Sequence, residues 1–176
     1  MKQRSFLWQW AGFSLITFGG MVLHFLYDWT GGCILAAPFS GVNESTWEHM
    51  KLLFWPLFLF SLVQWLFFRD QKNYWCVKLV EILLGLILIP VLFYTYNGVF
   101  GKSPDWINIA TFYISAALVF LFEWWAFKRV RLSCRHPRLA FVAICLIGIL
   151  FVVFTFIPSQ IPLFLDPLSG NFGIGS

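Results

Sequence analysis

The sequence predicts an all-α integral membrane protein: a five-helix transmembrane bundle with its N-terminus in the cytoplasm and its C-terminus outside. Of its 176 residues, 60% are hydrophobic and only 11% are charged, whereas a soluble domain carries about 25% charged residues. Several apolar runs reach the roughly 20 residues that cross a hydrocarbon core. The basic residues stand in short clusters between these runs, a pattern of membrane topology that speaks against a nucleic-acid partner. We expect residues 1–176 to form a single transmembrane domain in the cell membrane.

The first two spans are separated by a loop rich in helix breakers. We expect the first span to cover about residues 5–27. Its apolar run is longer than the roughly 7–15 residues of a signal-peptide core, and it contains His24, so a permanent helix is favoured over a cleaved signal. Gly31, Gly32 and Pro38 then interrupt the chain. The second span covers about residues 46–68 and ends at a short polar turn.

The other three spans follow with short connections. The third covers about residues 75–96 and contains Pro90, which membrane helices tolerate because neighbouring groups satisfy the freed carbonyl. The fourth covers about residues 106–127 and leads into a basic loop, and the fifth covers about residues 139–157. The outer tail, residues 159–176, is too short and too broken by proline to span again.

The distribution of lysine and arginine sets the expected orientation. Nine of these residues fall on one side of the predicted spans, and two, Lys51 and Lys102, fall on the other. The nine are Lys2, Arg4, Arg69, Lys72, Lys128, Arg129, Arg131, Arg135 and Arg138. The richer side is expected to be cytoplasmic, and an odd number of spans then puts the C-terminus outside.

The four cysteines are not expected to form an intramolecular disulfide. Cys33 is the only cysteine on the predicted outer side, where oxidation is favoured. Cys76 and Cys134 lie near the predicted inner face, and Cys145 lies within the fifth span. The even number of cysteines is therefore not taken as a disulfide framework.

Ionisable side chains gather at the predicted outer end. His24 and Asp28 are four residues apart and share a helix face, and Glu44 and Glu48 do so at the start of the second span. Glu48 and His49 point about 100° apart on a helix. A divalent metal such as zinc would therefore most naturally take Glu48, or Glu44, together with His24 and Asp28, with His49 at the rim.

Histidine and carboxylates at one membrane depth favour a membrane-embedded enzyme acting on a lipid-type substrate, either metal-dependent or by acid–base chemistry. The candidate catalytic residues are His24, Asp28, Glu44, Glu48 and His49. No known catalytic motif is present, so the reaction class stays open.

Three further residues are candidates for substrate binding at the same end. Asn43 would orient the substrate, Lys51 would bind an anionic head group, and Asp166 would close the pocket from the tail. In a metal-free variant of the same enzyme, one carboxylate would move a proton with the support of an imidazole.

Other interpretations compete with an enzyme. Ser45 and Glu48 form a capping-box pattern that needs no function. A structural subunit would use the polar motif only to hold helices together. A small-solute or ion carrier would use Glu81, an intramembrane carboxylate that also has Lys78 as a local ion-pair partner three residues earlier.

Residues 42–51, VNESTWEHMK, followed by an apolar run, resemble the signature of an uncharacterised family of small bacterial multi-span membrane proteins, a domain of unknown function. His24-x-x-x-Asp28 and the tail sequence PLFLDP, residues 162–167, fit the same resemblance. The resemblance implies a bacterial integral membrane protein with a polar outward site. It implies no activity.

Overall fold

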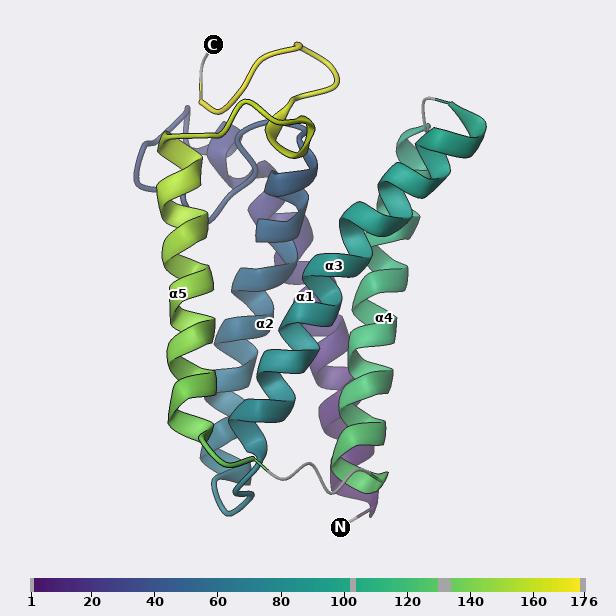
Figure 1. The fold of residues 1–176 in the computed structure, drawn as a ribbon, viewed down its shortest axis with the longest axis vertical. Coiled ribbons are helices and arrows are strands. Elements are labelled where there is room, and N and C mark those ends of the chain that lie inside the picture. The colour runs from purple at the N-terminus through teal and green to yellow at the C-terminus, as the bar shows by residue number, and fades with distance from the viewer. Residues whose placement is uncertain (1, 102–103, 130–133, 175–176) are drawn as a thin grey trace.

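The computed structural model describes residues 2–101, 104–129 and 134–174, and within these ranges it is all-helical apart from one isolated β-bridge between Leu165 and Phe172. The expected five long helices are confirmed (Figure 1). They are α1 (Lys2–Trp29), α2 (Thr46–Phe68), α3 (Tyr74–Phe100), α4 (Asp105–Arg129) and α5 (Pro137–Phe156), followed by a short 3₁₀ helix, η1 (Pro162–Phe164). Pro90 does not end α3, which continues ten residues beyond it.

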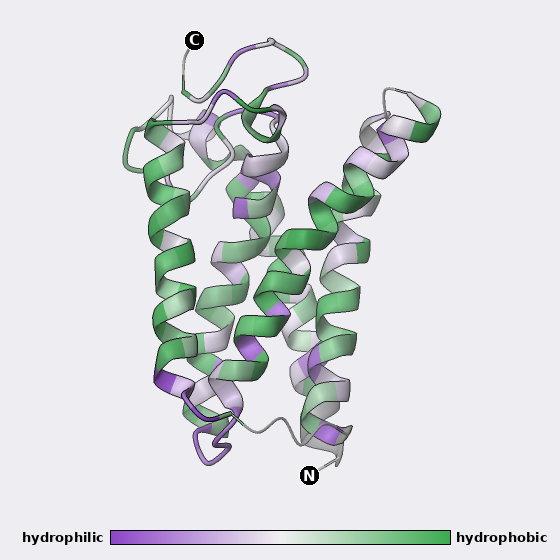
Figure 2. Ribbon diagram, in the orientation of Figure 1, coloured by the Kyte–Doolittle hydropathy of each residue, from purple (hydrophilic) through white to green (hydrophobic). Residues whose placement is uncertain are grey.

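The bundle exposes large apolar side chains and buries several charged ones. Phe67 is 66% exposed and Ile87 is 58% exposed, whereas the side chains of Lys51, Lys78 and Glu81 are fully buried. Lysine and glutamate are almost never buried so completely unless they are paired, as they are here. Figure 2 shows hydrophobic residues along most of each helix. All five helices are long and apolar enough to cross a membrane, which indicates a multi-pass membrane protein.

The helix α2 contacts all four other long helices, α3 contacts α2, α4 and α5, and α1 packs against α2 and α4. Leu53, Ile82 and Val119 belong to the buried core that these helices share. Gly85 allows α2 and α3 to approach, because a Cβ there would lie 2.6 Å from Leu53 Cδ2. Small residues at such contacts are typical of membrane bundles.

The loop between α1 and α2 and the tail after α5 lie at the same end of the bundle, opposite the start of α1 (Figure 1). The loop is held by α2, since Trp55 Nε1 of this helix donates a hydrogen bond to the Pro38 carbonyl at 2.9 Å. The tail is fixed by aromatic packing, since the Trp47 ring lies 4.7 Å from the Phe164 ring of η1. The two segments therefore form one cap over the start of α2.

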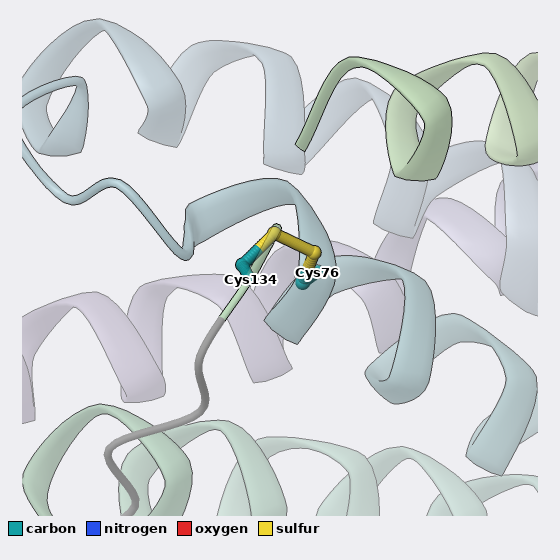
Figure 3. Close-up of a disulfide and its surroundings, with 2 residues drawn as sticks. All are labelled: Cys76 and Cys134. Atoms are coloured by element: carbon teal, nitrogen blue, oxygen red, sulfur yellow. A yellow bond between two sulfur atoms is a disulfide. The ribbon is translucent and has the colours of Figure 1, made fainter. Parts of the chain in front are cut away.

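The expectation that the cysteines form no intramolecular disulfide is wrong: Cys76 and Cys134 are bonded (Figure 3). Cys76 lies in the first turn of α3, and Cys134 lies in the connection that leads to α5. The start of α3 and the connection to α5 lie at the same end of the bundle. The two Cα atoms are 6.1 Å apart, within disulfide range. The prediction considered the redox compartment and neglected this proximity. Cys33 and Cys145 are free thiols.

We expect Cys76→Ser to destabilise the purified protein by about 2–4 kcal/mol, because the disulfide closes a long loop and restricts the unfolded chain. Peptide mapping of the non-reduced protein should recover a Cys76–Cys134 link. The matched controls Cys33→Ser and Cys145→Ser should leave both the link and the stability unchanged. Four free thiols in unreduced protein would contradict the bond.

Candidate functional site

The start of α2 is capped by the residues that precede it. Ser45 is the N-cap, and its hydroxyl accepts a hydrogen bond from the Glu48 amide at 3.4 Å. The Ser45 amide donates to Asn43 Oδ1 at 2.9 Å. The second half of the expected capping box is altered, because the Glu48 carboxylate accepts from the Val42 amide at 3.1 Å instead of returning to Ser45.

Glu48 and Lys51 form an ion pair beneath this cap. Lys51 Nζ lies 2.5 Å from Glu48 Oε2 and is fully buried. The same ammonium donates to the Ala37 carbonyl at 2.8 Å and to Thr155 Oγ1 of α5 at 3.0 Å. All three contacts hold the protein together. The structure therefore does not expose Lys51 to a lipid head group.

Asn43 and Asp166 are also engaged within the cap. Asn43 Nδ2 donates to the Gly173 carbonyl at 3.1 Å, which ties the tail to the start of α2. The Asp166 carboxylate accepts from the Leu168 amide at 2.9 Å and from the Ser169 hydroxyl at 2.6 Å. Asp166 thereby closes a turn within the tail, and Leu168 in this turn reaches the cavity described below.

Three other side chains converge: His24 near the end of α1, Glu44 in the loop, and His49 in the first turn of α2. His24 Nε2 lies 3.5 Å from Glu44 Oε1, and His49 Nε2 lies 3.5 Å from Glu44 Oε2. One ligand atom from each residue can be chosen so that all three lie within 4.8 Å of one another. All three side chains are half-buried.

The separation of these atoms suits a metal better than direct hydrogen bonds. At 3.5 Å, each imidazole is farther from Glu44 than the usual hydrogen-bond distance of about 2.7–3.2 Å. Ligands at about 2.1 Å from a tetrahedral zinc ion are separated by roughly 3.4 Å. Each His–Glu separation is of this size, with the two histidines facing different oxygens of Glu44.

The backbone of α2 fixes the orientation of the His49 ring. His49 Nδ1 lies 2.9 Å from the Ser45 carbonyl oxygen. A carbonyl only accepts, so Nδ1 carries the proton, and in the neutral ring Nε2 is left with a free lone pair. This lone pair is on the nitrogen that faces Glu44. A backbone carbonyl in this position is a common outer partner of a metal-binding histidine.

Ser40 joins the loop to the last turns of α1. Its hydroxyl donates to the Leu23 carbonyl and accepts from the Tyr27 amide, the latter at 2.8 Å. The Gly41 amide donates to the same Leu23 carbonyl at 3.2 Å. These bonds hold the loop against α1 next to His24, and the loop then carries Glu44 between the two imidazoles.

A cavity of about 490 Å³ opens beside the three residues, between α1, α2 and α4. His24, Glu44 and His49 form part of its wall. Most of the remaining wall is apolar, and the polar exceptions are Thr17 and Asn108 with the Tyr113 hydroxyl. The apolar lining consists of Gly20, Met21, Phe25, Leu52, Ile109, Phe112 and Leu168. The volume lies within the range of ligand sites, about 300–1,000 Å³.

The structure thus groups the candidate residues differently from the expected metal set, in which His24 and Asp28 were joined by Glu48 or Glu44 and His49 lay at the rim. His24, Glu44 and His49 meet. Asp28 lies exposed on the last turn of α1, outside the group, and Glu48 faces Lys51. The argument from helical angles failed at Glu44, because this residue precedes the helix and its loop folds back toward α1. The expected catalytic roles of all five residues remain predictions.

Apart from Asn108, sequence reasoning missed the part of the cavity wall that α4 supplies. Ile109, Phe112 and Tyr113 look like ordinary residues of an apolar span, and no local pattern marks them. The one available signal was Gly20 in α1, since Phe112 fills the space beside it: a Cβ at Gly20 would lie 2.5 Å from Phe112 Cζ.

The chain belongs to a family of unknown function, DUF6512, whose model matches residues 1–174. No curated protein and no solved structure matches the chain. Family membership was predicted from the motif at residues 42–51 and is confirmed.

We expect Lys51→Met to destabilise the protein by about 3–5 kcal/mol, because it leaves Glu48 as a buried, unpaired charge. The double variant Lys51→Met/Glu48→Gln removes both charges and should recover much of the loss. Denaturation of the detergent-solubilised protein measures both, with the exposed Lys72→Met as control. A Lys51→Met protein as stable as wild type would contradict the structural role.

Proposed function

We propose that this member of DUF6512 is a membrane-embedded, divalent-metal-dependent enzyme that acts on a lipid-type substrate. One observation carries the proposal. His24, Glu44 and His49 present ligand atoms within 4.8 Å of one another in the wall of a mainly apolar cavity of about 490 Å³. Ligands for a cation and room for an apolar chain thus adjoin at one end of the bundle.

The ligand set favours a catalytic over a structural metal site. Two histidines and a glutamate leave a fourth position of a tetrahedral zinc-type ion open, as in catalytic zinc sites. Such an ion would supply a water molecule activated for attack on an ester, amide or phosphoester bond. The chain's own residues do the rest: the Ser45 carbonyl orients His49, and Ser40 holds the loop that carries Glu44.

The cavity wall indicates the substrate class. Met21, Phe25 and Phe112 offer an apolar surface suited to an acyl or isoprenoid chain. The polar part of such a molecule would then lie at the three ligands, and Asn108 is placed on the wall to contact it. An amphipathic substrate could enter sideways from the bilayer, because the cavity lies between helices whose outer surfaces are apolar.

We further propose that the site faces the outer side of the cell membrane. Five basic residues lie in or next to the connections at the end of the bundle opposite the site: Arg69, Lys72, Lys128, Arg135 and Arg138. Lysine and arginine are retained on the cytoplasmic side during insertion. This supports a cytoplasmic start of α1 and an outer cap.

A purely structural role for the motif accounts for only part of it. Asn43, Ser45, Glu48 and Lys51 are all engaged in contacts that hold the cap together. Glu44 and His49 are not needed for those contacts, and with His24 they face the cavity. The metal site is therefore proposed on His24, Glu44 and His49, which those packing contacts do not require.

We expect the protein purified without chelator to contain about one divalent transition-metal ion per chain. His24→Ala, Glu44→Gln and His49→Ala should each lower the metal content at least tenfold, while the matched control Asp28→Asn retains it. Elemental analysis measures the content. Metal-free wild-type protein that also fails to bind added zinc would refute the metal site and leave acid–base chemistry by Glu44 and the histidines.

We expect Ile109→Trp to fill the cavity and to lower the amount of lipid that co-purifies, while the metal content stays unchanged. Ile114→Trp, on the same helix but outside the cavity wall, is the matched control. Lipid extraction followed by mass spectrometry compares the three proteins. Equal lipid profiles in all of them would argue against an apolar substrate in this cavity.

A further inference from the structure

A second group of ionisable residues lies in the opposite half of the bundle, away from the cavity. Lys78 and Glu81 of α3 and Glu123 of α4 are all fully buried, with 0% exposure. Lys78 Nζ lies 2.8 Å from Glu81 Oε2 and also pairs with Glu123 Oε1. The local Lys78–Glu81 pair expected from the sequence is confirmed, but Glu123 joins it from another helix.

The two carboxylates differ in their hydrogen bonds. Glu123 is satisfied on both oxygens, because Lys78 contacts Oε1 and Gln9 Nε2 of α1 donates to Oε2 at 2.8 Å. Glu81 has only the ion pair. Among the residues that the structure describes, no donor makes a well-directed hydrogen bond to either of its oxygens, and Gln9 Oε1 is also a buried acceptor without a donor.

The charges of this cluster do not balance. Two carboxylates face one ammonium group, which leaves one uncompensated negative charge if both are ionised. The neighbouring Tyr74, Ser61 and Gln64 are neutral, and the Tyr74 hydroxyl donates to the Ser61 carbonyl and not to a carboxylate. A buried charge without a partner costs several kcal/mol, so a further cation is needed.

A proton fits this need better than a metal ion. The residues of the cluster are fully buried and none of them lines the cavity described above, whereas a proton needs no additional room. Bound to Glu81, it would neutralise the excess charge. The protonated Glu81 carboxyl could also donate a hydrogen bond. The cluster contains a buried acceptor, Gln9 Oε1, that lacks a donor.

We propose that Lys78, Glu81 and Glu123 form an intramembrane proton-binding site, in which Glu81 carries one exchangeable proton while Glu123 remains ionised against Lys78. Intramembrane carboxylates of this kind are typical of proton-handling sites. The proposal does not depend on the metal site or on the proposed enzymatic activity, since the two groups share no residue.

Infrared spectroscopy of the full chain in lipid nanodiscs at neutral pH tests the site. The wild type should show the C=O band of a protonated carboxylic acid, and the band should shift in D₂O. Glu81→Gln removes the proton-binding group. Glu123→Gln leaves Lys78 with one carboxylate, so both variants should lose the band. Lys78→Met leaves two carboxylates and no ammonium, so its band should be about twice as strong.

Three control variants keep the assignment independent of any single variant. Glu81→Asp retains the acid and should shift the band without removing it, whereas Glu123→Asp should leave its position unchanged. Glu48→Gln should have no effect, because Glu48 is balanced one to one by Lys51. Overturning results would be a wild type without the band, a band of full intensity in Glu81→Gln, or no band together with stability that rises specifically with sodium.

Discussion

The capped end of the bundle depends on the contacts that the ammonium group of Lys51 makes. This group joins three parts of the chain: Glu48 on its own helix, Ala37 in the loop and Thr155 on α5. Within a hydrocarbon environment such a charge is stable only with its partners in place. Fixing Lys51 therefore fixes the loop, and the loop in turn carries Glu44 to the two histidines.

Two kinds of charged group thus coexist in one bundle. The pair of Lys51 and Glu48 is balanced, and it serves to position other residues. Lys78 faces two carboxylates, and this imbalance is the physical reason to assign the cluster a ligand. At the capped end of the bundle the distinction is geometric instead, because His24, Glu44 and His49 are close together without making ordinary hydrogen bonds to one another. In both places, function is inferred from what packing leaves unsatisfied.

The fold was largely predictable because run length and apolar composition determine membrane helices almost by themselves; the bounds of α2 were predicted to the residue. The polar end of the bundle was predictable as well. The grouping within it was not, because Glu44 lies in a loop whose course depends on Ser40 and Gly41 bonding back to α1. The α4 wall of the cavity and the pairing of Cys76 with Cys134 depend equally on contacts between distant segments, which local spacing does not report.

The disulfide between Cys76 and Cys134 lies at the end of the bundle that also carries most of the arginine and lysine residues. Basic residues mark a cytoplasmic face, while a persistent disulfide marks an oxidising compartment. The orientation proposed above puts that end in the cytoplasm, where reducing conditions favour the dithiol form of this pair. The disulfide, which ties the connection before α5 to α3, would then form when the protein meets an oxidant. Whether these two cysteines are reduced or bonded in intact cells therefore reports which compartment this end of the bundle faces.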